Sequence, residues 1–280
     1  MIDLHVHSTF SDGSFPPEDL IVQAKSIHLA AIALTDHDTT DGVGRFLAEA
    51  RSRSVRAVAG VEISADFKVG TFHMLGYFIR HDDSQLNQRL AWLREGREAR
   101  NAEILGKLTK LGMKLSWDEV RAFAGEDVVG RPHFAQAMMA RGYVLTKDEA
   151  FEKYLGKGKA GYAERRRLTP EDSIRLIRDA GGVAVLAHPF TLGLTPPDLR
   201  KLVGQLKDWG LGGIEVYYSE HTSDMERQYR DLAHDFGLVS TGGSDFHGAL
   251  SPDIKLGRGF GSLRVPDEVV DQLESRRTSA

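Results

Sequence analysis

The sequence predicts an α/β fold in which a β/α barrel is interrupted by a helical insertion. Short apolar runs alternate with amphipathic helical patterns over residues 2–77 and 170–240, as expected of parallel strands with helices outside them. Histidines and carboxylates follow strand after strand at the C-terminal end, where a β/α barrel carries its active site. Alternation alone would also fit an open doubly wound sheet, but the convergence of polar residues from so many strands favours a barrel.

The first part of the predicted barrel, residues 1–83, begins with a buried strand that leads to His5. In the helical pattern that follows, Leu20, Ile21 and Ala24 recur at the spacing of one helix face. The next apolar run ends at His37 and is followed by a second helix and two more strands. We expect strands at 2–4, 31–34, 57–63 and 71–77, and helices at 17–29 and 43–53.

The last part of the predicted barrel, residues 165–280, repeats the alternation of strands and helices. Thr169 is a suitable N-cap for its first helix, and Gly181-Gly182 provides a stop. We expect strands at 183–186, 213–217 and 238–240, and helices at 170–180, 197–209 and 224–236.

Residues 84–164 form the predicted insertion. The pattern there is helical almost throughout and begins with a long amphipathic segment that has Leu90, Leu93 and Ile104 at apolar positions. We expect this insertion to cap one mouth of the barrel. The expected helices cover 86–111, 117–123, 132–141 and 146–154.

The composition limits which catalytic and metal-binding groups the protein can use, and the N-terminal sequence bears on its cellular location. The chain of 280 residues has no cysteine, which excludes disulfides, thiolate zinc sites and cysteine nucleophiles, and it has 11 histidines. The formal net charge of −4 argues against nucleic-acid binding by a surface that is positively charged overall. The N-terminus has no signal-peptide pattern, and the longest apolar run, 29–34, is far too short to span a membrane. We therefore expect a cytoplasmic protein with no membrane partner and no obligate protein partner.

Histidines two residues apart give the first candidate ligands. His5 and His7 follow the first strand, where period-two alternation lets both imidazoles face one ion. Alone, such a pair is weak evidence, because surface or capping histidines are common. Asp12 precedes a glycine and would otherwise be an ordinary turn residue. Asp245 and His247 repeat the period-two spacing after the last strand.

Glu62 lies in an otherwise apolar strand, where an unpaired charge would cost several kcal/mol. Glu62 could bind a metal ion or form a buried salt bridge. The histidines at neighbouring strand ends favour metal binding. Neutral imidazole and carboxylate suit zinc, manganese or iron(II), and so many ligands would serve two or three ions. Such a centre is suited to phosphoester hydrolysis. The predicted metal ligands are His5, His7, Asp12, His37, Glu62, His73, His188, Asp245 and His247.

These motifs resemble those of the PHP (polymerase and histidinol phosphatase) family, which is amidohydrolase-like. The resemblance implies a distorted (β/α)7 barrel with a trinuclear metal centre. It implies one ion held by His5, His7, Glu62 and Asp245, a second by Glu62, His73 and His188, and a third by Asp12, His37 and His247. Some relatives have histidine where this chain has Asp12, and the harder oxygen ligand shifts the metal preference toward Mn²⁺ or Fe²⁺ and away from Zn²⁺. We expect three divalent ions, Mn²⁺ first, with Fe²⁺ or Zn²⁺ as alternatives. The motifs are His5-Val6-His7-Ser8-Thr9-Phe10-Ser11-Asp12-Gly13, Thr35-Asp36-His37-Asp38, Gly60-Val61-Glu62, His73, Ala187-His188-Pro189 and Ser244-Asp245-Phe246-His247.

Within that family, the chain resembles stand-alone phosphoesterases with a helical insertion. Their activities are hydrolysis of 3′,5′-nucleoside bisphosphates at the 3′-phosphate and 5′→3′ trimming of short RNA. The resemblance suggests that Arg131 clamps a phosphate and that His133 binds it or protonates the leaving oxygen. The competing interpretation of Arg131-Pro132-His133 is a plain helix start with proline in the first turn. Lys157 and Lys159 lie in a Gly-Lys repeat that fits either a phosphate-contacting lid or a solvated turn.

The function that we predict is metal-dependent removal of the 3′-phosphate from a 3′,5′-nucleoside bisphosphate such as pAp, through a metal-bridging hydroxide. The alternatives are 5′→3′ exoribonuclease action on short RNA, another phosphatase activity such as histidinol phosphatase, and a non-catalytic module. The Glu220-His221 pair would line the pocket or lie on the surface. We expect His28, His81 and His234 to take no part in metal binding.

Overall fold

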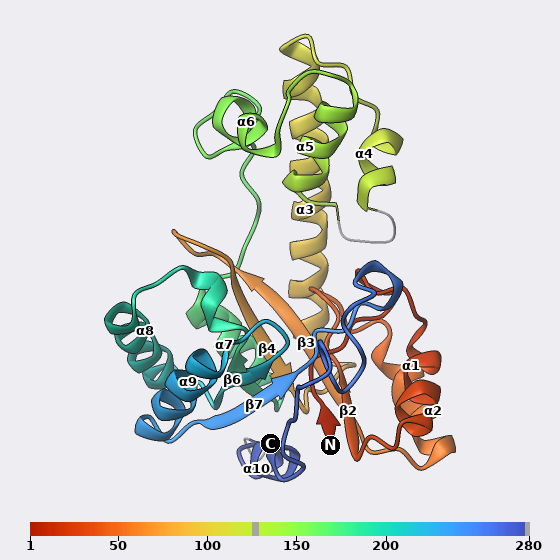
Figure 1. The fold of residues 1–280 in the computed structure, drawn as a ribbon, viewed down its shortest axis with the longest axis vertical. Helices are drawn as coiled ribbons and strands as arrows, with labels where there is room; N and C mark the ends of the chain where they lie inside the picture. Colours follow the sequence, from red (N-terminus) through yellow and green to blue (C-terminus); the bar gives the residue numbers. More distant parts are fainter. Residues whose placement is uncertain (125–128, 278–280) are drawn as a thin grey trace. The chain divides into compact units, whose positions relative to one another are not determined.

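The computed structural model describes residues 1–124 and 129–277 (Figure 1). Two compact units make up the chain. The first comprises Met1–Ala91 and Arg167–Ala280, and the second comprises Trp92–Arg166. Across the described residues, every helix is either too short or too polar to cross a membrane.

A seven-stranded mixed sheet curls into a nearly closed barrel in the first unit, as predicted. The two ends of the sheet approach each other, because the Leu4 backbone N–H donates to the Gly242 carbonyl and Val6 forms a bridge with Phe246. The strands follow one another in chain order: β1 (Ile2–Asp3), β2 (Ala31–Leu34), β3 (Ala57–Ala65), β4 (Phe72–Tyr77), β5 (Val183–Leu186), β6 (Gly213–Tyr218) and β7 (Val239–Gly243).

The expectation of an all-parallel sheet was wrong at β4, which runs antiparallel to both β3 and β5. Only residues 66–71 connect β3 to β4, and so short a connection cannot carry the chain back for a parallel strand. The reversal explains the position of His73. Because β4 runs the other way, a residue near its start pairs with Ser64 near the end of β3.

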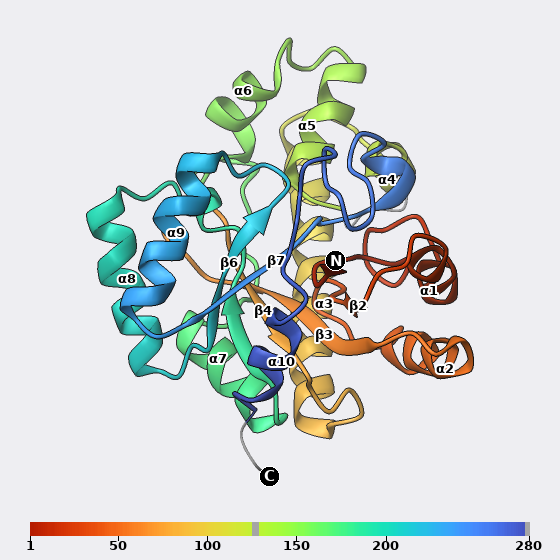
Figure 2. The same ribbon diagram turned by 60° about the horizontal axis from the view of Figure 1, so that its bottom comes forward.

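Helices surround the barrel (Figure 2). The helices at Pro17–Ser26 (α1) and Val43–Arg53 (α2) pack against each other beside β2 and β3, and the helix at Ser223–Asp235 (α9) packs on β6 and β7. The helices of this unit are α1 (Pro17–Ser26), α2 (Val43–Arg53), α7 (Pro170–Asp179), α8 (Pro196–Asp208), α9 (Ser223–Asp235) and α10 (Val269–Glu274), with 3₁₀ turns η2 (Pro189–Leu192) and η3 (Gly248–Leu250).

Side-chain alternation in β2 divides the core of this unit. Ala31 and Ala33 join an apolar cluster that includes Leu75 of β4 and residues of α10. Ile32 and Leu34 point the other way, into a cluster with α1 and α2. Two-sided burial accounts for the uninterrupted apolar run that predicts this strand.

The second unit is helical and has its own apolar core. Its helices are α3 (Ser84–Lys110), which starts in the first unit, α4 (Trp117–Ala124), α5 (Arg131–Ala140) and α6 (Lys147–Ala150). The helix expected at 146–154 divides into α6, which is capped by the Thr146 side chain, and a π-helical turn, η1 (Phe151–Leu155). Phe134 and Met138 of α5 are fully buried in the core of this unit.

Candidate metal centre

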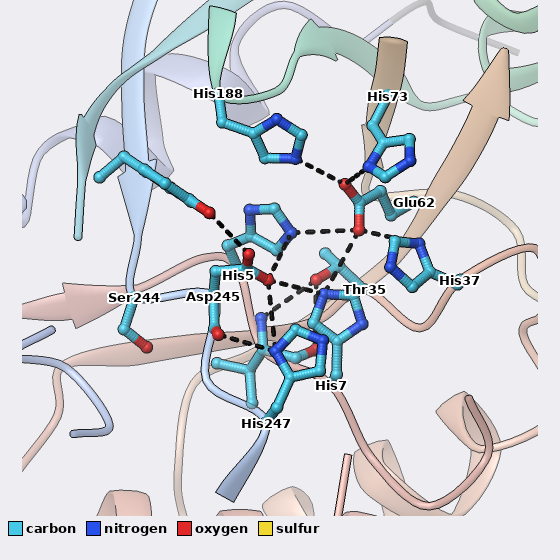
Figure 3. A network of polar contacts seen from close by, with 12 residues as sticks. His5, His7, Thr35, His37, Glu62, His73, His188, Ser244, Asp245 and His247 are labelled. Carbon is cyan, nitrogen blue, oxygen red and sulfur yellow. Dashed lines mark hydrogen bonds and ion pairs between the residues drawn. The ribbon is translucent and has the colours of Figure 1, made fainter. Parts of the chain in front are cut away.

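The nine predicted ligands come together in four overlapping groups of ligand atoms. Figure 3 labels all of them except Asp12. His5 and His7 follow β1, His37 follows β2, and Glu62 lies within β3. His73 lies at the start of β4, His188 follows β5, and Asp245 and His247 follow β7. Asp12 lies in the loop after β1. The histidine rings that Figure 3 labels point toward one another and toward the Glu62 carboxylate.

Glu62 lies at the middle of the cluster, with only 1% of its surface exposed. Its Oε1 lies 2.8 Å from Nδ1 of His73 and 3.1 Å from Nε2 of His188. Its Oε2 lies 3.3 Å from Nε2 of both His5 and His7 and 3.0 Å from Nδ1 of His37. One buried carboxylate thus faces five imidazoles, which is the geometry of a bridging ligand.

Two further carboxylates complete the donor set. Asp245 Oδ1 lies 3.3 Å from Nε2 of His5 and 3.1 Å from Nε2 of His7. Asp12 lies on the other side of His7, with its oxygens 3.3 Å from a ring nitrogen of His7, His37 and His247. His7 therefore contacts three different carboxylates, which no single ion pair could satisfy.

Ligand atoms close enough to share an ion fall into four overlapping groups. Two correspond to predicted sites, since one contains Asp12, His37 and His247 together with His7, and another contains His5, His7 and Asp245. Glu62 appears in the other two, once with His5 and His188 and once with His37 and His73. The division of ligands among three ions stays a prediction.

Unpaired donor atoms support metal binding. In the described part of the chain, five buried ligand atoms lie within ion-pair distance of one another or of a second Glu62 oxygen yet form no hydrogen bond of acceptable geometry: His5 Nε2, His7 Nε2, His37 Nδ1, Glu62 Oε2 and His73 Nδ1. Burying polar atoms without partners costs free energy, and such atoms rarely persist without a reason. Here they all face one another, and divalent cations would satisfy them together. The residues therefore fit the metal that the donor chemistry implies.

Electrostatics keep the three carboxylates ionised. Burial alone would raise their pKa values, but the neighbouring histidines hold the pKa of Asp12, Glu62 and Asp245 well below the usual range. Burial lowers the pKa of His37 to about 4, despite the opposing effect of Asp12 and Glu62. Burial would also lower the pKa of His5, but the surrounding carboxylates raise it well above the ordinary value.

Three of the six described non-glycine residues with positive φ angles lie at this end of the barrel. Asp38, His188 and Asp245 all have positive φ angles, of 53°, 21° and 57°. Side chains other than glycine rarely adopt this region, and residues that do so often lie at functional sites. Two of these three residues, His188 and Asp245, are predicted metal ligands.

Sequence reasoning missed four buried residues that hold the ligands. Glu215 contacts His5 and His188, and the Tyr218 hydroxyl donates to Asp245. Asp3 accepts from the backbone and hydroxyl of Ser244. Glu215 gave the same signal as Glu62, since it too interrupts an apolar strand. Asp36, the fourth, lies within a quoted motif but received no role.

Arg131 and His133 lie at the start of α5 in the second unit. The Arg131 guanidinium lies over the rings of Phe151 and Tyr162 and donates to the Leu155 carbonyl across 3.2 Å. His133 Nδ1 accepts from the Gly130 backbone N–H across 3.1 Å, as a capping box does. Burial, together with the charge of Lys147, lowers the pKa of His133. Both side chains therefore have a structural role within this unit.

The other residues that the sequence singled out are two lysines and four histidines. Lys157 and Lys159 are exposed, in the turn that follows η1. His221 donates from Nδ1 to the Val216 carbonyl and packs on Tyr218 and Tyr229, so it is part of an aromatic cluster. The remaining histidines, His28, His81 and His234, lie outside the four groups of ligand atoms.

Comparison with known proteins gives matches along most of the chain. A model of the PHP domain matches residues 3–131. A 5′-3′ exoribonuclease from Haemophilus influenzae is 33% identical over 97% of both chains. A 3′,5′-nucleoside bisphosphate phosphatase from Chromobacterium violaceum is 34% identical over 88% of this chain and 87% of its own. A phosphoribosyl 1,2-cyclic phosphate 1,2-diphosphodiesterase from Eggerthella lenta is 32% identical over 94% and 98%.

A solved structure agrees with these matches. An amidohydrolase from Chromobacterium violaceum, with bound sulfate and no metal, covers 98% of this chain and 96% of its own, with 32% identity and a TM-score of 0.79. The relatives named above carry names that describe action on different phosphoesters, and each of these matches covers most of this chain. The chain belongs to the PHP family of metal-dependent phosphoesterases.

Proposed function

We propose that this protein removes the 3′-phosphate from 3′,5′-nucleoside bisphosphates such as pAp, giving a nucleoside 5′-monophosphate and phosphate. The observation that carries the proposal is the meeting of nine imidazole and carboxylate ligands around Glu62. The similarity to a 3′,5′-nucleoside bisphosphate phosphatase supports the choice of substrate.

Three divalent ions, Mn²⁺ foremost, are proposed to occupy the cluster. Such ions lower the pKa of coordinated water and neutralise charge on phosphoryl oxygens. The chain's own part is to fix the ligands: Glu62 presents its two oxygens to different histidines, and Asp12 and Asp245 lie on opposite sides of His7. Three ions would add six positive charges to a chain whose formal charge is −4, and so attract a polyanionic substrate.

Arg131, His133, Lys157 and Lys159 are the proposed contacts to substrate phosphate. Arginine suits bidentate phosphate recognition, and the lysines add charge. The lowered pKa of His133 leaves its ring neutral near pH 7, with Nδ1 already accepting from Gly130. That state suits donation from Nε2 to a phosphate oxygen better than general-acid catalysis.

A second candidate function is 5′→3′ trimming of short RNA. The observation that favours it is the similarity to exoribonucleases at nearly the same identity as to the phosphatase. Both reactions would use the same ligands. They differ in the ester at phosphorus, which is a monoester in the bisphosphate and a diester in RNA.

The test compares pAp with a 5′-phosphorylated RNA dinucleotide, using protein reconstituted with Mn²⁺. The proposal predicts faster turnover of pAp, with one phosphate released per molecule. Faster cleavage of the dinucleotide would transfer the assignment to the exoribonuclease activity. Asp245→Ala should lose metal and turnover together, whereas Asp253→Ala, which changes an exposed carboxylate on the same segment, should retain both.

A further inference from the structure

Glu215 is a buried carboxylate that lies beside the metal ligands without belonging to any of the four groups. It lies on β6, and its surface is 0% exposed. Burying a charge is costly unless the group is fully hydrogen-bonded. The strand gains nothing in apolar packing from a glutamate, so the residue requires another explanation.

The two oxygens of Glu215 bind two different segments. Oε1 lies 2.9 Å from Nδ1 of His5, and Oε2 accepts from the backbone N–H of His188 across 2.7 Å. A single side chain on β6 therefore ties the segment after β1 to the segment after β5. Both of those segments carry predicted metal ligands.

The contact with His5 determines which ring nitrogen faces the centre. His5 Nε2 lies 3.3 Å from oxygens of Glu62 and Asp245, on the metal side, while Nδ1 faces Glu215. When a carboxylate accepts from Nδ1–H, the neutral imidazole keeps its lone pair on Nε2. Hydrogen bonds of this kind orient metal-binding histidines and increase their basicity.

The contact with His188 stabilises an unfavourable backbone. His188 has φ of +21°, outside the regions that side chains other than glycine ordinarily adopt. Its N–H is bound by Glu215, and its Nε2 lies 3.1 Å from Glu62. Glu215 thus holds the peptide from which this ligand projects.

We propose that Glu215 is a positioning residue of the metal centre, which sets the Nε2-binding tautomer of His5 and fixes the backbone of His188. The proposal rests on the metal binding that the proposed function requires and is independent of the substrate. A carboxylate is required because both partners are donors. Glutamine has one acceptor oxygen, so its amide N–H₂ would face either the His188 N–H or His5 Nδ1. In the second orientation, His5 would keep its proton on Nε2 and could not bind a cation.

The experiment measures Mn²⁺ binding to metal-free protein by calorimetry and by metal content after dialysis. Glu215→Gln is compared with Glu220→Gln, a matched change at an exposed glutamate just after the same strand. Loss of such a partner typically weakens metal binding by roughly 10- to 100-fold. We expect that loss in Glu215→Gln, with wild-type affinity in Glu220→Gln and an unchanged circular dichroism spectrum in both.

A second readout needs only the wild-type chain. In Zn²⁺-loaded protein, ¹⁵N spectra should show a proton on His5 Nδ1 and none on Nε2. Wild-type Mn²⁺ affinity in Glu215→Gln, or a bare Nδ1 in the spectra, would overturn the role of Glu215. Failure of the wild-type protein to bind any metal would instead overturn the proposed function.

Discussion

The Tyr218 hydroxyl donates to Oδ2 of Asp245 across 2.8 Å, which leaves Oδ1 of the same carboxylate facing His5 and His7. Tyr218 is buried, and burial beside that carboxylate raises the pKa of its hydroxyl. The phenol therefore stays protonated and serves as a fixed donor that orients a metal ligand.

Removing this hydroxyl should weaken the metal centre without dismantling the fold. A hydrogen bond to a charged group contributes about 1.5–3 kcal/mol, so we expect Tyr218→Phe to reduce Mn²⁺ affinity by roughly tenfold or more. Calorimetric titration of metal-free protein measures this. Tyr217→Phe is the matched control, because Tyr217 is the preceding residue of β6 and its ring lies under Arg230. Equal affinity in the two variants would count against an orienting role for Tyr218.

Asp36 should matter through the loop that carries Asp12. It accepts from the Ser8 backbone N–H and hydroxyl, both at 2.7 Å, and from the Ser11 hydroxyl at 2.6 Å. Asp36→Asn would leave one of these donors facing an amide N–H₂. We expect the free energy of unfolding of metal-free protein to fall by about 1–3 kcal/mol, measured by urea denaturation. The exposed change Asp82→Asn should have little effect, and an equal loss in both variants would contradict this account.

Gly243 permits the close approach of β7 to the segment after β1. A Cβ at this position would lie 2.3 Å from the His5 backbone nitrogen and 2.4 Å from the His5 Cβ. Gly243→Ala should therefore displace His5, lower the free energy of unfolding by about 1–3 kcal/mol and weaken Mn²⁺ binding. Thermal denaturation and metal titration measure the two effects. Gly106→Ala, whose Cβ would meet open space, is the control. A Gly243→Ala protein with wild-type affinity would show that the strands can separate freely.

The ring of His133 should make the helical unit sensitive to acid. Its pKa in the folded protein is lowered by burial, so the folded state favours the neutral ring. The stabilising effect is complete above the unfolded pKa of about 6.5 and is lost as the pH falls toward the folded pKa. The stability gap between wild type and His133→Ala should shrink between about pH 7 and pH 5. Urea denaturation at several pH values measures it, and a gap that widens in acid would refute the assignment.

Much of the barrel was predictable because its strands are short apolar runs and its ligands lie at their ends. The period-two spacing of His5 and His7 and the lone charge of Glu62 carried the metal prediction. The direction of β4 was not predictable from its own residues, because the short connection before it decides the orientation. The π-helical turn after α6 was likewise missed, since hydrophobic spacing alone does not distinguish it from an α-helix.

The supporting residues were harder to recognise than the ligands. Glu215 interrupts an apolar strand as Glu62 does, yet no histidine pair stands beside it in the sequence. Asp3 ends β1 and Asp36 follows β2, and their roles depend on partners far along the chain, such as Ser244 for Asp3. For Arg131, the sequence suggested a phosphate contact, and the structure adds contacts with Phe151 and Tyr162 that the sequence did not reveal.

The most direct test follows bound Mn²⁺ and phosphate release from pAp in one titration of metal-free protein. We predict that metal-free protein is inactive, that turnover rises with bound metal, and that Glu62→Gln fails on both measures because five imidazoles lose their shared carboxylate. Full turnover without bound metal, or a Glu62→Gln protein that binds Mn²⁺ and hydrolyses pAp like the wild type, would contradict the central claim.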